Sequence, residues 1–164
     1  MMSAPSHRTD IRLKRAAPDD AGRIQAMLKE SFAGLLETYQ DYETSPATMT
    51  ADAVRLRLEQ PQTYYYFIIA DGETVGGIRV VDFKDEQTRK RISPLFVLPA
   101  YRNRGIAQKA IARAEEMHGP AHWMLDTVLQ EKGNCHLYEK MGYHQTGRTQ
   151  VVNERMTLVY YEKD

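Results

Sequence analysis

Residues 102–107, with the sequence RNRGIA, place a glycine between basic residues where an apolar run gives way to an amphipathic stretch. The run, LFVLP at residues 95–99, is typical of a buried strand, so the segment predicts a strand that turns into a helix. The first N–H groups of a helix have no partner inside the helix, and the helix dipole favours anions there. Gly105 has no Cβ, so an anion can approach its backbone closely. The segment therefore predicts a phosphate-binding turn.

A second segment, LYEKMGY at residues 137–143, lies further along the chain. Together the two segments resemble motifs of the GNAT family of N-acetyltransferases, in that family's order and at its usual separation. Arg102, Gly105 and Ala107 fill the fixed positions of the family's acyl-CoA motif, Gln/Arg-x-x-Gly-x-Gly/Ala. Residues 137–143 resemble its closing motif, in which Tyr-Glu-Lys precedes an apolar residue, a glycine and an aromatic residue. The turn lacks the Lys-Ser/Thr pair of a P-loop, which disfavours an unrelated nucleotide site.

The resemblance implies acetyl-CoA as cosubstrate, held in a cleft between the strand at residues 95–98 and the strand at residues 123–128. The exposed backbone of Leu95, Phe96 and Val97 would pair with the pantetheine arm, because an unpaired strand edge offers free donors and acceptors. An ordinary core strand is the alternative, and the two are compatible because the side chains can be core while the backbone binds. The pyrophosphate would lie on the turn formed by Arg102, Asn103, Arg104, Gly105, Ile106 and Ala107.

Tyr138 is the predicted general acid, since the resemblance implies a phenol directed at the coenzyme sulfur. An unperturbed phenol has a pKa of about 10 and a thiol of about 8.5, so the phenol keeps its proton at neutral pH and can pass it to a thiolate. Taken without the motif, a tyrosine on an apolar helix face is more often a core residue, and core packing is the alternative.

Asp126 is the candidate general base, because it lies on the facing strand where a glutamate stands in the ribosomal-protein branch of the family. Aspartate is one methylene shorter, so we expect a water relay rather than direct proton abstraction. A carboxylate that binds backbone at a strand end is the alternative. Asp85 and Glu86 are weaker candidates for the same role.

The segment before Tyr138 departs from the family pattern. Where the family often has a pantetheine-binding asparagine, seven residues before Tyr138, this chain has Glu131. Asn134 either contacts the cofactor instead or caps the helix predicted at residues 134–141. Cys135, beside His136, is predicted to be a small buried residue without a chemical role.

Apolar periodicity gives the element order β-α-α-β-β-β-α-β-α-β-β, which is the order of the GNAT fold. We therefore predict a mixed α/β sandwich with a mostly antiparallel sheet and helices on both faces. Residues 1–9 are predicted to be a flexible arm and residues 10–164 a single domain. A loop is expected at residues 37–49, and Met117 is expected on the apolar face of the helix at residues 105–118.

Composition excludes several classes of protein. Lysine plus arginine and aspartate plus glutamate both number 22, which disfavours a nucleic-acid protein with a basic face. The sequence has no apolar run long enough for a membrane span and no signal peptide, and its one cysteine cannot form an internal disulfide. These features predict a cytoplasmic protein. The histidines show no metal-ligand spacing, so no metal site is predicted.

The resemblance implies that the first two helices and their connection line the acceptor side. Here that connection carries acidic and aromatic residues: Glu37, Tyr39, Asp41, Tyr42 and Glu43. This pattern suits a small cationic amine, with a solvated loop as the alternative. The function predicted is acetyl transfer from acetyl-CoA to a primary amine by direct attack in a ternary complex. A protein or peptide N-acetyltransferase and a non-catalytic acyl-CoA-binding module are the alternatives, and a homodimer is left open.

Overall fold

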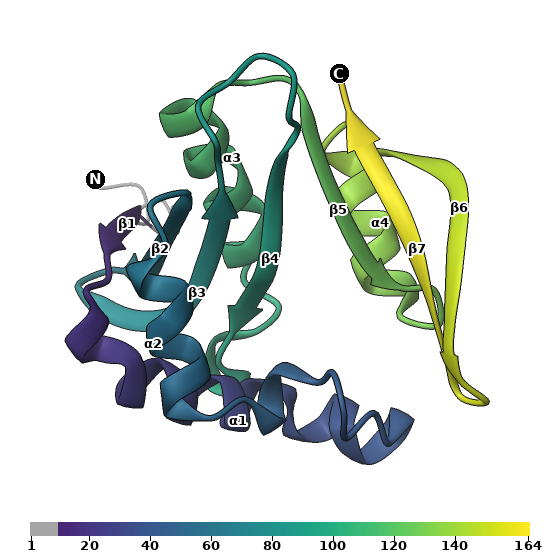
Figure 1. Ribbon diagram of the computed structural model, residues 1–164, viewed down its shortest axis with the longest axis horizontal. Coiled ribbons are helices and arrows are strands. Elements are labelled where there is room, and N and C mark those ends of the chain that lie inside the picture. The colour runs from purple at the N-terminus through teal and green to yellow at the C-terminus, as the bar shows by residue number, and fades with distance from the viewer. Residues whose placement is uncertain (1–9) are drawn as a thin grey trace, which may run out of the picture.

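The computed structural model describes residues 10–164, so the predicted arm at residues 1–9 lies outside the described part. The described residues form one seven-stranded sheet and four α-helices in the predicted order (Figure 1). The strands are β1 (Ile11–Arg15), β2 (Thr63–Ala70), β3 (Glu73–Val81), β4 (Lys90–Val97), β5 (Trp123–Val128), β6 (His144–Asn153) and β7 (Met156–Lys163). The helices are α1 (Ala21–Tyr39), α2 (Ala51–Glu59), α3 (Ile106–His118) and α4 (Lys132–Lys140). Short 3-10 turns occur at Pro18–Asp20, Pro46–Thr48 and Pro99–Tyr101.

The sheet has the strand order β1-β2-β3-β4-β5-β7-β6 and is antiparallel except between β4 and β5. That parallel pair is short, since it joins Lys90 to Trp123 and Arg91 to Met124 before the two strands separate. Figure 1 shows β4 and β5 diverging from this end towards α1. The edge of β4 that faces β5 therefore lacks a strand partner from Ile92 onward.

The two faces of the sheet carry separate apolar clusters. One cluster joins β2, β3 and β4 to α3 and continues across β5 and β7 to α4, with Ile78, Ile111, Trp123 and Tyr161 at its centre. The other joins the opposite face of β2 and β4 to α1 and α2. The helices thus cover both faces of the sheet, as predicted for this fold class.

Local sequence accounts for several element boundaries. The Thr50 hydroxyl accepts a hydrogen bond from the Ala53 N–H at the start of α2, as a helix cap does. Gly142, at φ +94°, follows the last residues of α4 in the left-handed conformation that favours glycine.

Three local predictions are wrong. Helix α1 continues to Tyr39, three residues into the expected loop, because Tyr39 is buried and anchors its last turn. Helix α4 begins at Lys132, so Asn134 lies inside its first turn and does not cap it. Met117 is 51 % exposed, since the buried face of α3 is formed by Ala110, Ala114 and their neighbours.

Within residues 10–164, no helix is long and apolar enough to cross a bilayer.

Candidate active site

The predicted phosphate-binding turn has the backbone conformation that its sequence requires. Gly105 immediately precedes α3 with φ +73°, and Asn103 also has a positive φ, of +64°. In the described part of the chain, no side chain caps α3, so its first N–H groups point outward without an acceptor from a cap. A Cβ at Gly105 would meet nothing within 4 Å, so the space above the turn is open. An anion can therefore approach this helix start.

The two arginines of the turn have different environments. Arg102 donates from Nε to the Val97 carbonyl at 3.1 Å and from Nη2 to the Ser31 carbonyl at 2.6 Å. Its side chain thus ties the turn to the end of β4 and to α1. Arg104 lies over the ring of Tyr101, 5.7 Å from the ring centroid, and is exposed. Of the two guanidinium groups, that of Arg104 is the freer to reach a bound phosphate.

Strand β4 combines core side chains with an open backbone edge, as expected for residues 95–97. Phe96 is buried against α1, while Leu95 and Val97 pack on the α3 side. One edge of these residues pairs with β3, where Gly76 lies opposite Val97 and Gly77 opposite Phe96. The other edge faces the space between β4 and β5. The backbone of Leu95, Phe96 and Val97 therefore lies at the opening, although the Val97 carbonyl is already bound by Arg102.

Gly76 and Gly77 lie beside the candidate site, and the sequence motifs do not include them. A Cβ at Gly76 would lie 2.1 Å from the Phe96 carbonyl oxygen, and one at Gly77 would lie 2.4 Å from the Phe96 ring. Both positions must therefore be glycine for β3 to approach β4 this closely. Two adjacent glycines inside a strand pattern are the signal that could have revealed them.

Tyr138 lies on the buried face of α4, on the wall opposite the turn. Its ring contacts those of Tyr143 and Tyr161, with centroids 6.1 and 6.2 Å away. Burial, and after it the nearby negative charge of Asp126, raises the pKa of Tyr138. The phenol therefore holds its proton at neutral pH, as a general acid must before it donates.

A buried ionic network fixes the aromatic neighbour of Tyr138. The Tyr143 hydroxyl donates to Glu115 at 3.0 Å, and the Lys163 ammonium donates to the same carboxylate at 3.0 and 3.1 Å. Burial, followed by the charge and hydrogen bond of Glu115, raises the pKa of Tyr143. The network joins α3, the end of α4 and β7, and so holds the Tyr138 ring in place.

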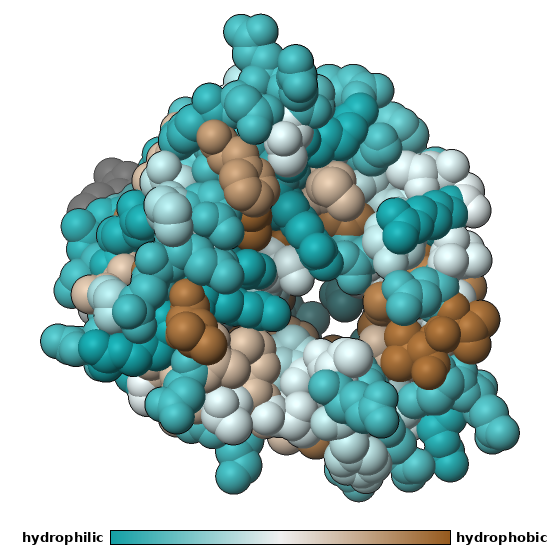
Figure 2. All heavy atoms as spheres, in the orientation of Figure 1, coloured by the Kyte–Doolittle hydropathy of each residue, from teal (hydrophilic) through white to brown (hydrophobic). Residues whose placement is uncertain are grey.

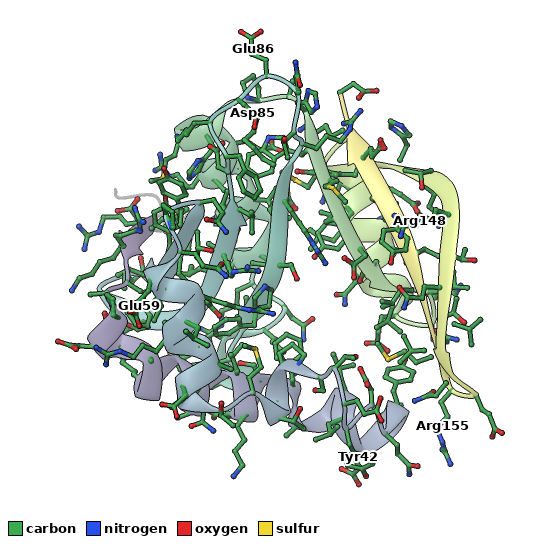
Figure 3. The ribbon with its side chains drawn as sticks, in the orientation of Figure 1. Tyr42, Glu59, Asp85, Glu86, Arg148 and Arg155 are labelled. Atoms are coloured by element: carbon green, nitrogen blue, oxygen red, sulfur yellow. The ribbon has the colours of Figure 1, made fainter. Side chains whose placement is uncertain are left out.

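Asp126 lies on the other face of β5 from Trp123 and Leu125, because side chains alternate along a strand. Its carboxylate accepts from Arg91 Nη2 at 2.7 Å. The candidate acid and the candidate base thus lie on opposite faces of the sheet. Asp85 and Glu86 lie at the tip of the β3–β4 connection, far from this opening (Figure 3). The structure therefore does not bring those two alternatives to the site.

Residues before Tyr138 have structural contacts that the sequence did not reveal. Glu131 accepts a 2.5 Å hydrogen bond from the Tyr39 hydroxyl, which connects α4 to the end of α1. Asn134 is exposed on the first turn of α4. Cys135 is buried, as predicted, with Sγ within 3.9 Å of the carbonyls of Val128 and Leu129. A role for Asn134 in cofactor binding stays a prediction.

The acidic and aromatic residues expected to bind the acceptor do not form one group. Tyr39 binds Glu131, and Asp41 is buried and accepts from the backbone and hydroxyl of Thr44. Glu37 and Glu43 are exposed, and Tyr42 is 64 % exposed and directed away from the rest of the molecule (Figure 3). Tyr39 and Asp41 thus make hydrogen bonds that stabilise the end of α1 and the connection after it.

The opening between β4 and β5 is visible on the molecular surface. Figure 2 shows a deep hollow near the centre of this face, between the part built around β4 and the part built around β5. An opened, mostly antiparallel sheet with a glycine turn before a helix at its mouth is the architecture of acyl-CoA N-acyltransferases. Within residues 10–164, no three histidine, cysteine or acidic side chains are grouped so that they could hold a metal ion.

The chain belongs to the acetyltransferase (GNAT) family, whose model matches residues 24–143. A search among curated proteins finds no match. Solved structures share the fold at low sequence identity. An acetyltransferase from Thermus thermophilus is 15% identical with a TM-score of 0.68, covering 92% of this chain and 94% of that one.

Two further structures give similar values. Spermidine N-acetyltransferase from Vibrio cholerae, in complex with CoA and spermine, is 14% identical with a TM-score of 0.72, covering 92% of this chain and 93% of that one. The ribosomal-protein-S18-alanine N-acetyltransferase from Escherichia coli is 10% identical with a TM-score of 0.71, covering 93% and 92%. This chain is therefore an acetyltransferase of the GNAT fold.

Proposed function

We propose that this protein transfers an acetyl group from acetyl-CoA to a primary amine by direct attack in a ternary complex. When bound, acetyl-CoA supplies the thioester whose acyl carbon the amine attacks. The observation that carries the proposal is the uncapped start of α3 at Gly105, beside the open edge of β4 and across from Tyr138. Those groups suit a pyrophosphate, a pantetheine arm and a thiol leaving group, in that order along the opening.

The side chains then have distinct roles. The turn at residues 102–107 and the backbone of residues 95–97 hold the cosubstrate in the opening, which positions the reacting groups. Tyr138 donates its proton as the sulfur leaves. Asp126 takes the proton of the amine through a water molecule, with the carboxylate oxygen that Arg91 does not bind. The proton count balances, because one proton leaves the amine and one reaches the thiolate.

The neighbours support two classes of acceptor. The Vibrio cholerae neighbour is a spermidine acetyltransferase, which supports a small amine. The Escherichia coli neighbour acts on a protein alanine, which keeps protein acetylation as the second candidate. A small cationic acceptor, a homodimer and a cytoplasmic location stay predictions from the sequence.

The first experiment is a calorimetric titration with acetyl-CoA of the wild type, Gly105→Glu and Gly147→Glu. Gly147 is the matched control, since it also has a positive φ, of +92°, and also has nothing within 4 Å of a Cβ, but it lies on β6. A carboxylate at residue 105 would repel the pyrophosphate and occupy its place. We expect wild-type binding on the order of micromolar, a loss of at least about tenfold in Gly105→Glu, and no change in Gly147→Glu.

Two results would contradict the proposal. If the wild type does not bind acetyl-CoA, then acetyl-CoA is not its cosubstrate and the proposed reaction is wrong. If Gly105→Glu binds acetyl-CoA as tightly as the wild type, the phosphates do not bind at the start of α3.

A further inference from the structure

Three arginines from three different elements gather on the α1 and α2 side of the sheet, next to the opening. We call Arg57 of α2, Arg79 of β3 and Arg91 of β4 the arginine cluster. Arg79 pairs in register with Tyr65, and Arg91 pairs with Val81, which lies two residues after Arg79. Since alternate residues of a strand share a face, Arg79 and Arg91 lie on the face where Tyr65 packs against α1 and α2.

The three positive charges of the arginine cluster are not all matched by acidic partners. Among the described residues, its one ion pair is that between Arg91 and Asp126. Arg79 donates from Nη1 to a neutral acceptor, the Ser93 carbonyl, at 2.7 Å. Burial, and then the charges of Arg57 and Arg91, lowers the pKa of Arg79 to about 10. Burial likewise lowers the pKa of Arg57, and the charge of Arg91 adds to this effect. The strand register places Arg79 and Arg91 on one face, where their like charges repel each other.

Two buried polar atoms beside the cluster lack partners. Within the described residues, Arg79 Nε and the hydroxyl of Tyr65, a residue that is only 2 % exposed, are buried and have no hydrogen-bond partner. A buried polar group without a partner costs about 1–3 kcal/mol, and a bound ion or solvent molecule is one way in which that cost is relieved. Guanidinium groups present forked donors that match a carboxylate. Charge excess and unused donors therefore point to the same kind of ligand.

We infer that the arginine cluster binds a carboxylate of the acceptor, so that the acceptor is an amine that also carries a carboxylate, such as an amino acid. The inference rests on the proposed function and specifies its substrate class. With the carboxylate on Arg57 and Arg79, the amine end extends towards Asp126, which Arg91 holds at the edge of the opening. Figure 2 shows hydrophilic side chains on the β4 side of the central hollow and hydrophobic ones on its other side.

The same charge disfavours a polyamine at this position. A further cation near three guanidinium groups adds repulsion, while an anion relieves it. The acidic residues expected to attract a cation, Glu37 and Glu43, are exposed on α1 and its connection rather than in this cluster. An amino-acid acceptor and a polyamine acceptor thus predict opposite results when both compounds are tested as substrates.

The first arm of the test compares matched acceptors. Coenzyme A release would be measured at saturating acetyl-CoA for the common L-amino acids, for the corresponding amino-acid amides, and for spermidine. We expect at least one amino acid to exceed its amide by about tenfold or more in kcat/KM. Arg57→Gln should raise KM for that amino acid about tenfold and leave the amide unchanged.

Arg55→Gln is the matched control, because Arg55 lies on the same helix but pairs with Glu59 at 3.3 Å and Asp19 at 3.8 Å. Its KM should equal that of the wild type. If amides or spermidine are acetylated as well as amino acids, or if Arg57→Gln and Arg55→Gln behave alike, the inference is wrong while the acetyltransferase function stands.

The second arm does not depend on activity. The Nε–H signal of Arg79 in a ¹⁵N NMR spectrum, assigned with Arg79→Lys, would be followed during titration with sodium acetate at constant ionic strength. We expect a saturable shift that is weaker in Arg57→Gln and unchanged in Arg55→Gln. A shift that does not saturate would overturn the anion site. Saturation without any acetyl transfer would keep the site and contradict the proposed function instead.

Discussion

At the scale of single residues, Tyr138 has a packing role, and we propose a chemical role for it as well. Its ring is held between Tyr143 and Tyr161, and burial keeps its phenol protonated. Phenylalanine preserves the ring contacts and removes the hydroxyl, so a substitution to phenylalanine separates the two roles.

We expect Tyr138→Phe to lower kcat by about 10²-fold or more, because a positioned general acid contributes roughly 10²–10⁴-fold. Binding of acetyl-CoA and the melting temperature should stay close to wild type. Steady-state kinetics and calorimetry on the same preparations would check this. Tyr160→Phe is the control, since its hydroxyl binds Gln150 on the sheet face away from α4.

Wild-type kcat in Tyr138→Phe would contradict the acid role and favour protonation of the sulfur by solvent. Absence of turnover in the wild type, together with tight acetyl-CoA binding, would instead support a non-catalytic acyl-CoA-binding module.

Several single-residue predictions could be made from the sequence because motifs fix backbone positions. Gly105 and Tyr138 lie where the two motifs place them. The partner that a long side chain binds could not be predicted in the same way, because that partner is often distant in sequence. Arg102 reaches the Ser31 carbonyl, 71 residues away, and Asp126 binds Arg91, 35 residues away. Neither contact leaves a periodic signal in the chain.

At the scale of elements, the pairing of β3 with β4 sets the position of the open edge. Gly76 and Gly77 let the two strands approach where Phe96 crosses between them. The geometry of the opening therefore depends on two residues that have no side chain to contribute chemistry.

We expect Gly76→Ala to lower the free energy of unfolding by about 3 kcal/mol or more, because the new Cβ meets a backbone carbonyl that cannot rotate away. Gly34→Ala should do the opposite. Gly34 lies inside α1 with nothing within 4 Å of a Cβ, so alanine there should stabilise by about 0.5–1 kcal/mol. Urea denaturation of both variants would test the pair. A Gly76→Ala protein as stable as wild type would show that β3 and β4 can separate without cost.

Element type and order could be predicted from the sequence, while element ends and the arrangement on one face could not. Alternation and helical spacing report which residues are buried, and this is a local property. Tyr39 extends α1 because it binds Glu131, which is 92 residues away. The arginine cluster likewise depends on the register of β2, β3 and β4, and no single segment contains it.

At the scale of the whole molecule, two parts of the sheet enclose the opening and are joined at both of its ends. At one end, β4 pairs with β5 through Lys90 and Arg91. At the other, the Tyr39 hydroxyl donates to Glu131, and the Asn153 amide donates to the Tyr39 carbonyl at 2.9 Å. Figure 1 shows the end of α1 reaching towards β7 and β6. The last helical turn of α1 thus connects the part of the sheet that carries the phosphate-binding turn at residues 102–107 to the part that carries Tyr138.

We expect Tyr39→Phe to loosen this bridge without unfolding the protein. The substitution removes a hydrogen bond to a carboxylate, which contributes about 1.5–3 kcal/mol, and leaves that carboxylate without its partner. Amide hydrogen exchange should become faster in the last turn of α1 and in residues 129–134, while the core of β2 and β3 keeps its protection. Tyr42→Phe is the control, since Tyr42 lies three residues later and is 64 % exposed.

Equal exchange in both variants would mean that the short β4–β5 pairing and the Asn153 contact suffice to hold the two parts. Faster exchange confined to Tyr39→Phe, reversed by acetyl-CoA, would show that the cosubstrate bridges the same opening.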